Sequence, residues 1–221
     1  MPIRYMPLVT GEIYHVLNRG VAGQTIFPDV RANQRFLQLL NYYQYLEAPV
    51  KFSSFLTINR DDRETLERQL LKSGRRWVEI IAYCLMPNHF HLLVRQVADR
   101  GIFQFIRRTG ISYSRYFNLR HDRFGPLLQG VFKAVRVESE EQLIHVIRYI
   151  HINPYVGMVV KKEGLADYPW SSLPDYLGLG AGEVRLVKEK LIKIGKGYLR
   201  QIMEEAEDRR RVKALGRLNL E

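Results

Sequence analysis

Cysteine, acidic residues and long apolar runs are all scarce in this chain. Cys84 is the one cysteine among 221 residues, which excludes an internal disulfide and makes the reducing cytoplasm the expected compartment. No apolar run approaches the roughly 18–20 residues that a membrane-spanning helix needs. Nor does the sequence show a basic segment followed by an apolar stretch and a small-residue cleavage site, so we expect no secretory leader.

The charge balance is strongly basic. The chain has 34 Lys and Arg against 23 Asp and Glu, which gives a net charge of +11. Such an excess indicates the partner rather than the fold, and nucleic acid is the first candidate, with an acidic membrane surface as the rival. A hydrophobic content of 46% supports a sizeable core, and the length fits one domain with or without an appendage.

Hydrophobic periodicity predicts a mixture of strands and helices. Strands are expected over residues 11–17, 77–85, 89–94 and 131–137, and helices over 29–45, 61–71, 99–119 and 139–153. This order is typical of an α+β fold of the split βαβ type, with an antiparallel sheet and helices on one face. Residues 1–160 form the expected main domain. The composition shifts beyond them, so 161–221 are expected to be a mostly helical extension whose last dozen residues are candidates for disorder.

Two histidines flank one apolar residue in the stretch Met-Pro-Asn-His-Phe-His. Met-Pro-Asn-His is predicted to be a turn between paired strands. Because side chains on a strand alternate between faces, His89 and His91 share one face about 6–7 Å apart, and Phe90 points into a core. Two imidazoles at this spacing suit one cation. The alternative is a pair of histidines hydrogen-bonded on a solvated sheet face.

The helix that begins at Ser139 has clear boundaries in the sequence. Ser139-Glu140-Glu141-Gln142 is a capping box, in which Gln142 is expected to bond back to the cap. Pro154 is expected to end the helix. His151, like His145, is expected on the helix surface.

One face of this helix is polar. Residues four apart share a helical face, so His145, Tyr149 and Asn153 align along it. A helix packed across the sheet could bring Tyr149 and Asn153 over His89 and His91.

The chemistry that uses a tyrosine, two histidines and an asparagine in this way is phosphodiester transesterification. A tyrosine hydroxyl is a weak nucleophile at neutral pH, and it attacks a phosphate when a divalent cation withdraws charge from the phosphate oxygens. Two imidazoles and an amide oxygen suit Mn²⁺ better than Mg²⁺, although Mg²⁺ tolerates some nitrogen ligation.

These stretches together resemble the REP-associated tyrosine transposases, single-tyrosine HUH transposases related to the smallest insertion-sequence transposases. His-Phe-His is similar to the HUH motif, and Tyr-Ile-His-Ile-Asn-Pro over residues 149–154 is similar to the nucleophile motif. Residues 14–20 resemble the first strand and turn, and residues 116–133 resemble the central basic block, where Leu128 and Val131 replace the usual tryptophan and arginine. The resemblance covers roughly residues 8–178.

The resemblance implies a fold, a reaction and a site. The implied fold is ferredoxin-like or RRM-like. Tyr149 is the implied catalytic nucleophile, with His89, His91 and Asn153 as ligands of a divalent metal, Mg²⁺ or Mn²⁺. The implied substrate is single-stranded DNA beside a REP-like hairpin, cleaved and rejoined through a 5′-phosphotyrosine, in the cytoplasm at the nucleoid. No nucleotide cofactor and no membrane are implied. Some relatives are dimers that exchange catalytic helices, so monomer and homodimer both remain open.

A basic segment lies between these motifs. Between Arg107 and Arg136 there are seven Lys or Arg and one acidic residue, Asp122, with aromatic residues interleaved. Cations with aromatics are typical of single-strand binding, whereas the alternative is a solvated charged face. The predicted DNA-binding residues are Arg19, Arg107, Arg108, Arg115, Arg120, Arg123, Lys133 and Arg136.

Four alternatives stay open from the residues themselves. The chain has 13 tyrosines, and Tyr113, Tyr116 and Tyr155 compete with Tyr149 as nucleophile. Asn153 could instead be a C-cap residue before the proline. The whole protein could be a non-catalytic RRM-like nucleic-acid-binding module with structural histidines, or a metal phosphodiesterase that uses activated water.

Overall fold

The computed structural model describes residues 7–46, 48–180, 184–187 and 197–218, with side chains through residue 211. Its strands are β1 (Ile13–Arg19), β2 (Val78–Met86), β3 (His89–Gln96) and β4 (Lys133–Val137). Its α-helices are α1 (Val30–Tyr43), α2 (Phe52–Phe55), α3 (Arg60–Ser73), α4 (Gly101–Arg120), α5 (Glu140–Val156), α6 (Leu173–Leu177) and α7 (Tyr198–Leu218). Short 3₁₀ turns cover Val21–Gly23 and Lys162–Gly164.

The four strands form one antiparallel sheet in the order β2-β3-β1-β4. β2 and β3 are joined by the tight turn at Pro87–Asn88, as the sequence predicts. β1 lies between β3 and β4 in the sheet. Along the chain, α1 lies between β1 and β2, and α4 lies between β3 and β4. This is the ferredoxin-like arrangement, so the α+β prediction is confirmed.

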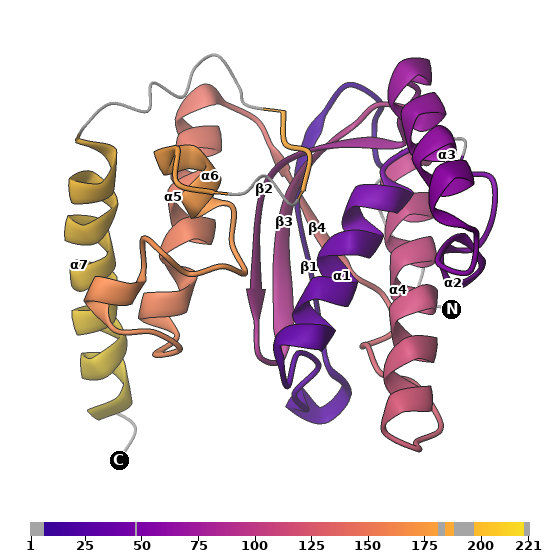
Figure 1. Cartoon of the computed structure of the whole chain (residues 1–221). Coiled ribbons are helices and arrows are strands. Elements are labelled where there is room, and N and C mark those ends of the chain that lie inside the picture. Colours follow the sequence, from indigo (N-terminus) through magenta and orange to yellow (C-terminus); the bar gives the residue numbers. More distant parts are fainter. Residues whose placement is uncertain (1–6, 47, 181–183, 188–196, 219–221) are drawn as a thin grey trace.

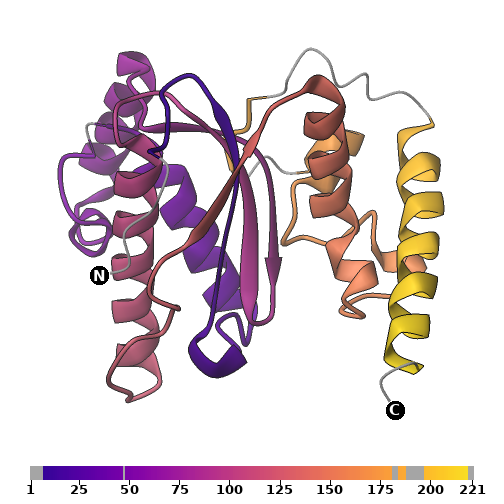
Figure 2. The ribbon, with the colours of Figure 1, turned by 180° about the vertical axis from the view of Figure 1, so that it is seen from behind.

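Helices cover both faces of the sheet, and the prediction of helices on one face is wrong. α1 to α4 lie on one side of the sheet, and α5, α6 and α7 lie on the other (Figure 1; Figure 2 gives the view from behind). The two βαβ crossovers do place α1 and α4 on the same face. α5 follows the last strand and packs on the opposite face, where it meets the side chains of Ile81 and Leu93. β2 is buried along nearly its whole length, which is typical of a strand covered on both sides.

Two further details of α5 differ from the sequence expectation. Ser139 caps the helix through the backbone N–H of Gln142, as predicted, but the Gln142 side chain accepts from the N–H of Glu138 rather than from the cap residue. Pro154 does not end the helix, which continues to Val156 and stops at Gly157. A proline in the last turn removes one N–H, and the backbone N–H of Gly157 still bonds the carbonyl of Asn153.

The C-terminal part of the chain packs on α5. A small core that includes Ile152, Tyr198 and Ile202 joins α7 to α5. His151, expected on the surface, is fully buried, and its ring nitrogens lie 2.8 Å from the Tyr198 hydroxyl and 2.9 Å from Ser172 Oγ. The backbone is helical through Leu218, and residues 219–221 of the predicted disordered end lie outside the described residues. None of the helices in the described part of the chain is long and apolar enough to span a membrane.

Candidate active site

The two histidines of β3 lie on the sheet face that α5 covers. His89 and His91 project to the same side, with ring centroids 5.0 Å apart, and Phe90 points into the core on the other side. The alternation of side chains along a strand is the physical cause. Cross-strand pairing sets Arg19 opposite His89 and Leu17 opposite His91, so the Arg19 side chain shares this face.

A third histidine joins this pair from β1. His15 Nε2 lies 2.9 Å from His91 Nδ1, and the two rings stack with centroids 5.1 Å apart. Burial lowers the pKa of His15 to about 4, and burial together with the neighbouring histidines holds the pKa of His91 well below its usual value. Both rings are therefore neutral at pH 7 and carry a nitrogen lone pair. Sequence reasoning did not assign His15 to the site, although it is the polar side chain between Ile13 and Leu17 on that face.

The Tyr149 ring lies against these histidines. Its centroid is 5.6 Å from that of His91 and 5.9 Å from that of His15, in edge-on geometry. An apolar stripe of α5 is buried in the core and consists of Leu143, Ile147 and Ile150. Because this stripe packs on the sheet, the neighbouring Tyr149 side chain is held against the sheet as well. The tertiary structure thus brings together residues of β1, β3 and α5 that are distant in the sequence.

Hydrogen bonds orient the polar groups around this cluster. Asn88 Nδ2 donates to the carbonyl of Gly23, so its Oδ1 faces His89 Nδ1 at 2.6 Å and must accept the proton of that nitrogen. His89 is then the tautomer whose lone pair is on Nε2. Asn153 Nδ2 donates to the Tyr149 carbonyl at 2.8 Å, which leaves the amide oxygen as the atom suited to a cation. Among the described side chains, ring contacts tie Tyr149 to the histidines, whereas no hydrogen bond or ion pair joins Asn153 to them.

Helix α7 supplies a cation to the site. The guanidinium of Arg209 lies over the Tyr149 ring, 5.1 Å from its centroid. The same group donates to His145 Nε2 at 2.8 Å and pairs with Glu205 at 2.8 Å. Sequence reasoning gave Arg209 no role in the site, and no local pattern could have assigned one, because the contact depends on how α7 docks on α5.

The competing tyrosines lie in other surroundings. Tyr113 is buried on the opposite face of the sheet, where its hydroxyl donates to the Ile26 carbonyl and burial raises its pKa strongly. Tyr116 belongs to α4 on that same side. Tyr155 is largely buried, and the guanidinium of Arg210 lies over its ring. Among these four tyrosines, Tyr149 is the one in contact with His91.

The sheet divides the predicted DNA-binding cations into two groups. Arg19 and Lys133 lie on the histidine face, since Lys133 pairs with Leu17. The remaining predicted cations lie on the face of the sheet that α4 covers, or at the edge of that face. They are Arg107, Arg108, Arg115, Arg120, Arg123 and Arg136.

Three cations of that second group are already bonded to the protein. Arg120 pairs with Asp29 at 2.7 Å, and Arg136 pairs with Glu12 at 2.8 Å. Arg123 donates to Asn118 at 2.9 Å. The two ion pairs neutralise their arginines in part, which makes these positions weaker candidates for phosphate binding than Arg107, Arg108 and Arg115.

The donor set fits a divalent cation in its chemistry. His89 and His91 offer neutral imidazoles on one face, and a ligating imidazole is commonly oriented by a hydrogen bond through its other nitrogen, as both are here. Within the described part of the chain, no three His, Cys, Asp or Glu side chains form a metal-binding group. A cation here would therefore rest on two imidazoles, an amide oxygen and oxygens from substrate or water.

Comparison with known proteins finds one matching family model. Residues 56–153 match the family model described as "Transposase IS200 like". This segment runs from the loop before α3 through the Tyr149 region of α5, and this part of the chain is similar to IS200-like transposases. The resemblance to REP-associated tyrosine transposases is thereby supported.

The solved structures agree in fold. One matching chain is a REP-associated tyrosine transposase bound to a REP hairpin, with a TM-score of 0.55 and 14% sequence identity. The match covers 89% of this chain and 98% of that one. At this identity the likeness shows the fold. No curated protein sequence matches significantly.

Proposed function

We propose that this protein is a metal-dependent single-stranded DNA endonuclease and strand transferase with Tyr149 as its nucleophile. The observation that carries the proposal is the packing of the Tyr149 ring on His91 and His15, beside His89. A transposase of this family needs one nucleophile next to a charge-neutralising centre, and Tyr149 is the described tyrosine that meets this requirement. Residues 1–160 form the proposed catalytic unit, with 161–221 as its helical extension.

The proposed reaction is a transesterification. The Tyr149 hydroxyl loses its proton and its oxygen bonds to the scissile phosphorus, while the bond from phosphorus to the 3′ oxygen breaks. The 3′ oxygen takes a proton, and the 5′ phosphate stays on Tyr149. The bond energy is retained in the phosphotyrosine, so a 3′ hydroxyl can attack it in reverse and rejoin strands.

The protein residues proposed to assist are those of the histidine face. A divalent cation, Mg²⁺ or Mn²⁺, held by His89, His91 and Asn153 would neutralise charge on the phosphate oxygens. His15 would accept the Nδ1 proton of His91, which keeps the His91 Nε2 lone pair available. Arg19 and Lys133 would hold the phosphate backbone on this face.

The proposed substrate is single-stranded DNA that carries a hairpin. The support is the solved relative of the same fold, which is bound to a REP hairpin. The net charge of +11 supports a polyanionic partner.

Covalent capture tests the proposal. Labelled hairpin oligonucleotides are incubated with the protein in Mn²⁺, Mg²⁺ or EDTA and resolved on denaturing gels. We expect a metal-dependent adduct in the wild type and in Tyr116→Phe, a matched control tyrosine, and no adduct in Tyr149→Phe.

The other outcomes point to the alternatives. Binding without an adduct over a varied oligonucleotide pool would favour a non-catalytic RRM-like module. Cleavage that persists in Tyr149→Phe would assign the reaction to activated water or to another tyrosine, and the nucleophile proposed here would be wrong.

A further inference from the structure

Helix α7 is anchored to α5 up to the turn that carries Arg209. Ile202 and Ala206 are fully buried in the small core that joins the two helices, and the Tyr198 hydroxyl forms a buried hydrogen bond with α5. The two helices run side by side (Figures 1 and 2). Arg209 lies about one helical turn beyond Ala206. Packing already present in the free protein therefore holds its side chain at Tyr149, without a movement of α7.

Both helices fix the position of the Arg209 guanidinium. Glu205, one turn earlier on α7, forms an ion pair with Arg209 Nη2 at 2.8 Å. From α5, His145 Nε2 accepts a hydrogen bond from the same nitrogen at 2.8 Å, because a guanidinium only donates. The guanidinium carbon lies 5.1 Å from the centroid of the Tyr149 ring. A cation that is held from two elements has little conformational freedom left to lose when an anion binds, which favours binding.

These contacts leave part of the guanidinium for a ligand. An arginine has five N–H donors, and both polar contacts of Arg209 among the described residues use Nη2. Arg120 and Arg136 differ, because each presents two nitrogens to one carboxylate, that of Asp29 and that of Glu12. In those two arginines the carboxylate takes the fork that a phosphate would use. In Arg209 the N–H groups of Nη1 and Nε can still donate to phosphate oxygens.

The position of Arg209 places these donors beside the atoms proposed to react. The proposed cleavage joins the Tyr149 oxygen to the scissile phosphorus, so the phosphate comes to the end of the ring that Arg209 covers. Negative charge on the non-bridging oxygens grows as the new bond to phosphorus forms. Donors that are held in place before the reaction stabilise such developing charge more than they stabilise the bound substrate.

We propose that Arg209 is a catalytic residue, whose guanidinium binds the scissile phosphate and stabilises the charge on its non-bridging oxygens during attack by Tyr149. The proposal rests on the proposed function, which supplies the phosphodiester. Arg209 keeps its protons throughout, and the bonds that form and break are those of the transesterification above. The helical extension after residue 160 then contributes a residue to the active site.

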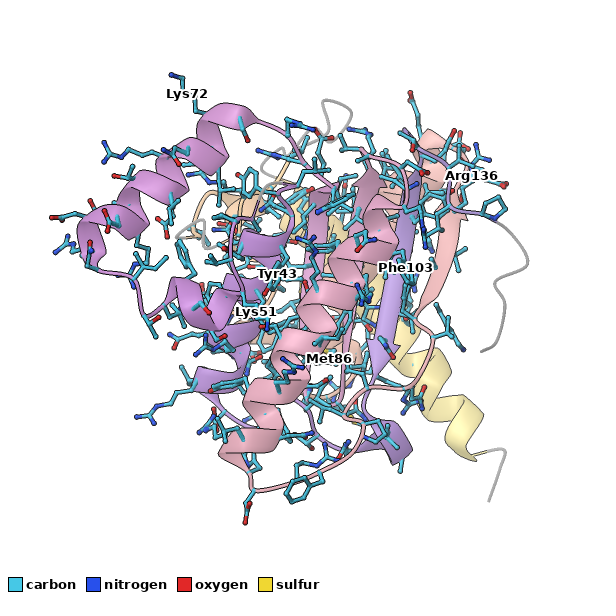
Figure 3. All side chains as sticks on the ribbon, turned by 90° about the vertical axis from the view of Figure 1, so that its right-hand side faces the viewer. Tyr43, Lys51, Lys72, Met86, Phe103 and Arg136 are labelled. Carbon is cyan, nitrogen blue, oxygen red and sulfur yellow. The ribbon has the colours of Figure 1, made fainter. Side chains whose placement is uncertain are left out.

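The test measures the single-turnover rate of adduct formation with a saturating hairpin oligonucleotide and Mn²⁺, so that a change in DNA affinity does not enter. The variant is Arg209→Gln. The matched control is Arg200→Gln, which also lies on α7 and also loses an ion pair with a glutamate four residues away, Glu204. A second control is Lys72→Gln, which removes a charge from the end of α3, on the other face of the sheet (Figure 3).

Arg209→Gln is expected to lower the rate about 100-fold, and both controls are expected to react at the wild-type rate. Arg209→Lys retains the charge and loses the planar fork, so its rate should be intermediate. Thermal melting checks that each variant is folded, and Arg209→Lys serves as the test if Arg209→Gln is not. A wild-type rate in Arg209→Gln would overturn the inference. A faster rate would also overturn it, because α7 would then act as a cover over Tyr149.

Phosphorothioates separate a contact with the phosphate from a structural role. The two diastereomers at the cleaved position each replace one non-bridging oxygen by sulfur, which accepts hydrogen bonds weakly. For at least one diastereomer, the ratio of the wild-type rate to the Arg209→Gln rate should fall to about ten or less. The same ratio on the phosphate and on both diastereomers would assign Arg209 a structural role and overturn the inference. A wild type that forms no adduct with any oligonucleotide would instead defeat the proposed function itself.

Discussion

Acid should unfold this protein through its buried histidines, and His151 allows the effect to be isolated. Its ring is fully buried between the Tyr198 hydroxyl and Ser172 Oγ, and burial lowers its pKa to about 3. The unfolded chain titrates near pH 6.5. The folded-state pKa is thus depressed, so below pH 6.5 the unfolded state binds a proton that the folded state does not, and stability falls with pH until about pH 3.

The size of the effect follows from the two pKa values. Between pH 7.5 and 5.5 the linkage costs about 1.4 kcal/mol for His151. In the metal-free protein His15, with a pKa of about 4, adds a similar amount. His91, whose pKa burial holds well below its usual value, changes stability in the same direction. We expect His151 and His15 together to lower the free energy of unfolding by about 3 kcal/mol over this range, and His91 to lower it further.

Urea denaturation in EDTA at both pH values measures this fall. In His151→Gln the pH-dependent loss should shrink by about 1.4 kcal/mol, whatever the overall stability of the variant. Tyr198→Phe is the control, because it removes one hydrogen-bond partner and retains the titrating ring, so it should lower stability at both pH values and keep the pH-dependent loss. An equal pH-dependent loss in the wild type and in His151→Gln would refute the reasoning.

The remaining predictions concern packing and metal binding. Ser172→Ala should lower the free energy of unfolding by about 1–3 kcal/mol, measured by urea denaturation, because Ser172 Oγ accepts from a buried backbone N–H at 3.0 Å. Gly101→Ala should prevent stable folding, checked by thermal melting, because its Cβ would lie 2.1 Å from the Trp77 carbonyl oxygen; a wild-type melting temperature would contradict this. Mn²⁺ at about 100 times its Kd should stabilise the wild type by about 2.7 kcal/mol, and the shift should vanish in the His89→Ala, His91→Ala double variant; an unchanged shift there would place the metal elsewhere.

Local patterns account for much of the fold. Alternation along β3 determines that His89 and His91 share a face and that Phe90 does not. Ser139 starts α5 through its predicted cap, and the turn at Pro87–Asn88 joins two strands as expected. These features depend on a few neighbouring residues, so they can be predicted from the sequence alone.

The predictions that were wrong concern features that local sequence patterns do not determine. The apolar run from Ile80 to Met86 in β2 was a signal that both faces of the sheet are covered, but periodicity alone does not say which helix covers which face. His151 looked like a surface residue because its place on α5 says nothing of α7, which packs there and buries it. Helix propensity also did not reveal that α5 tolerates Pro154 in its last turn.

The sequence by itself determined the types of residue in the candidate site and the faces on which His89, His91 and Tyr149 lie, because strand and helix periods are local. Only the tertiary structure decided that His15, 76 residues from His91, completes the histidine cluster, and that Arg209 covers Tyr149. It alone divided the basic residues between two faces of the sheet. The physical reason is that these contacts depend on how separate elements dock, and docking is set by the whole apolar core rather than by any short segment.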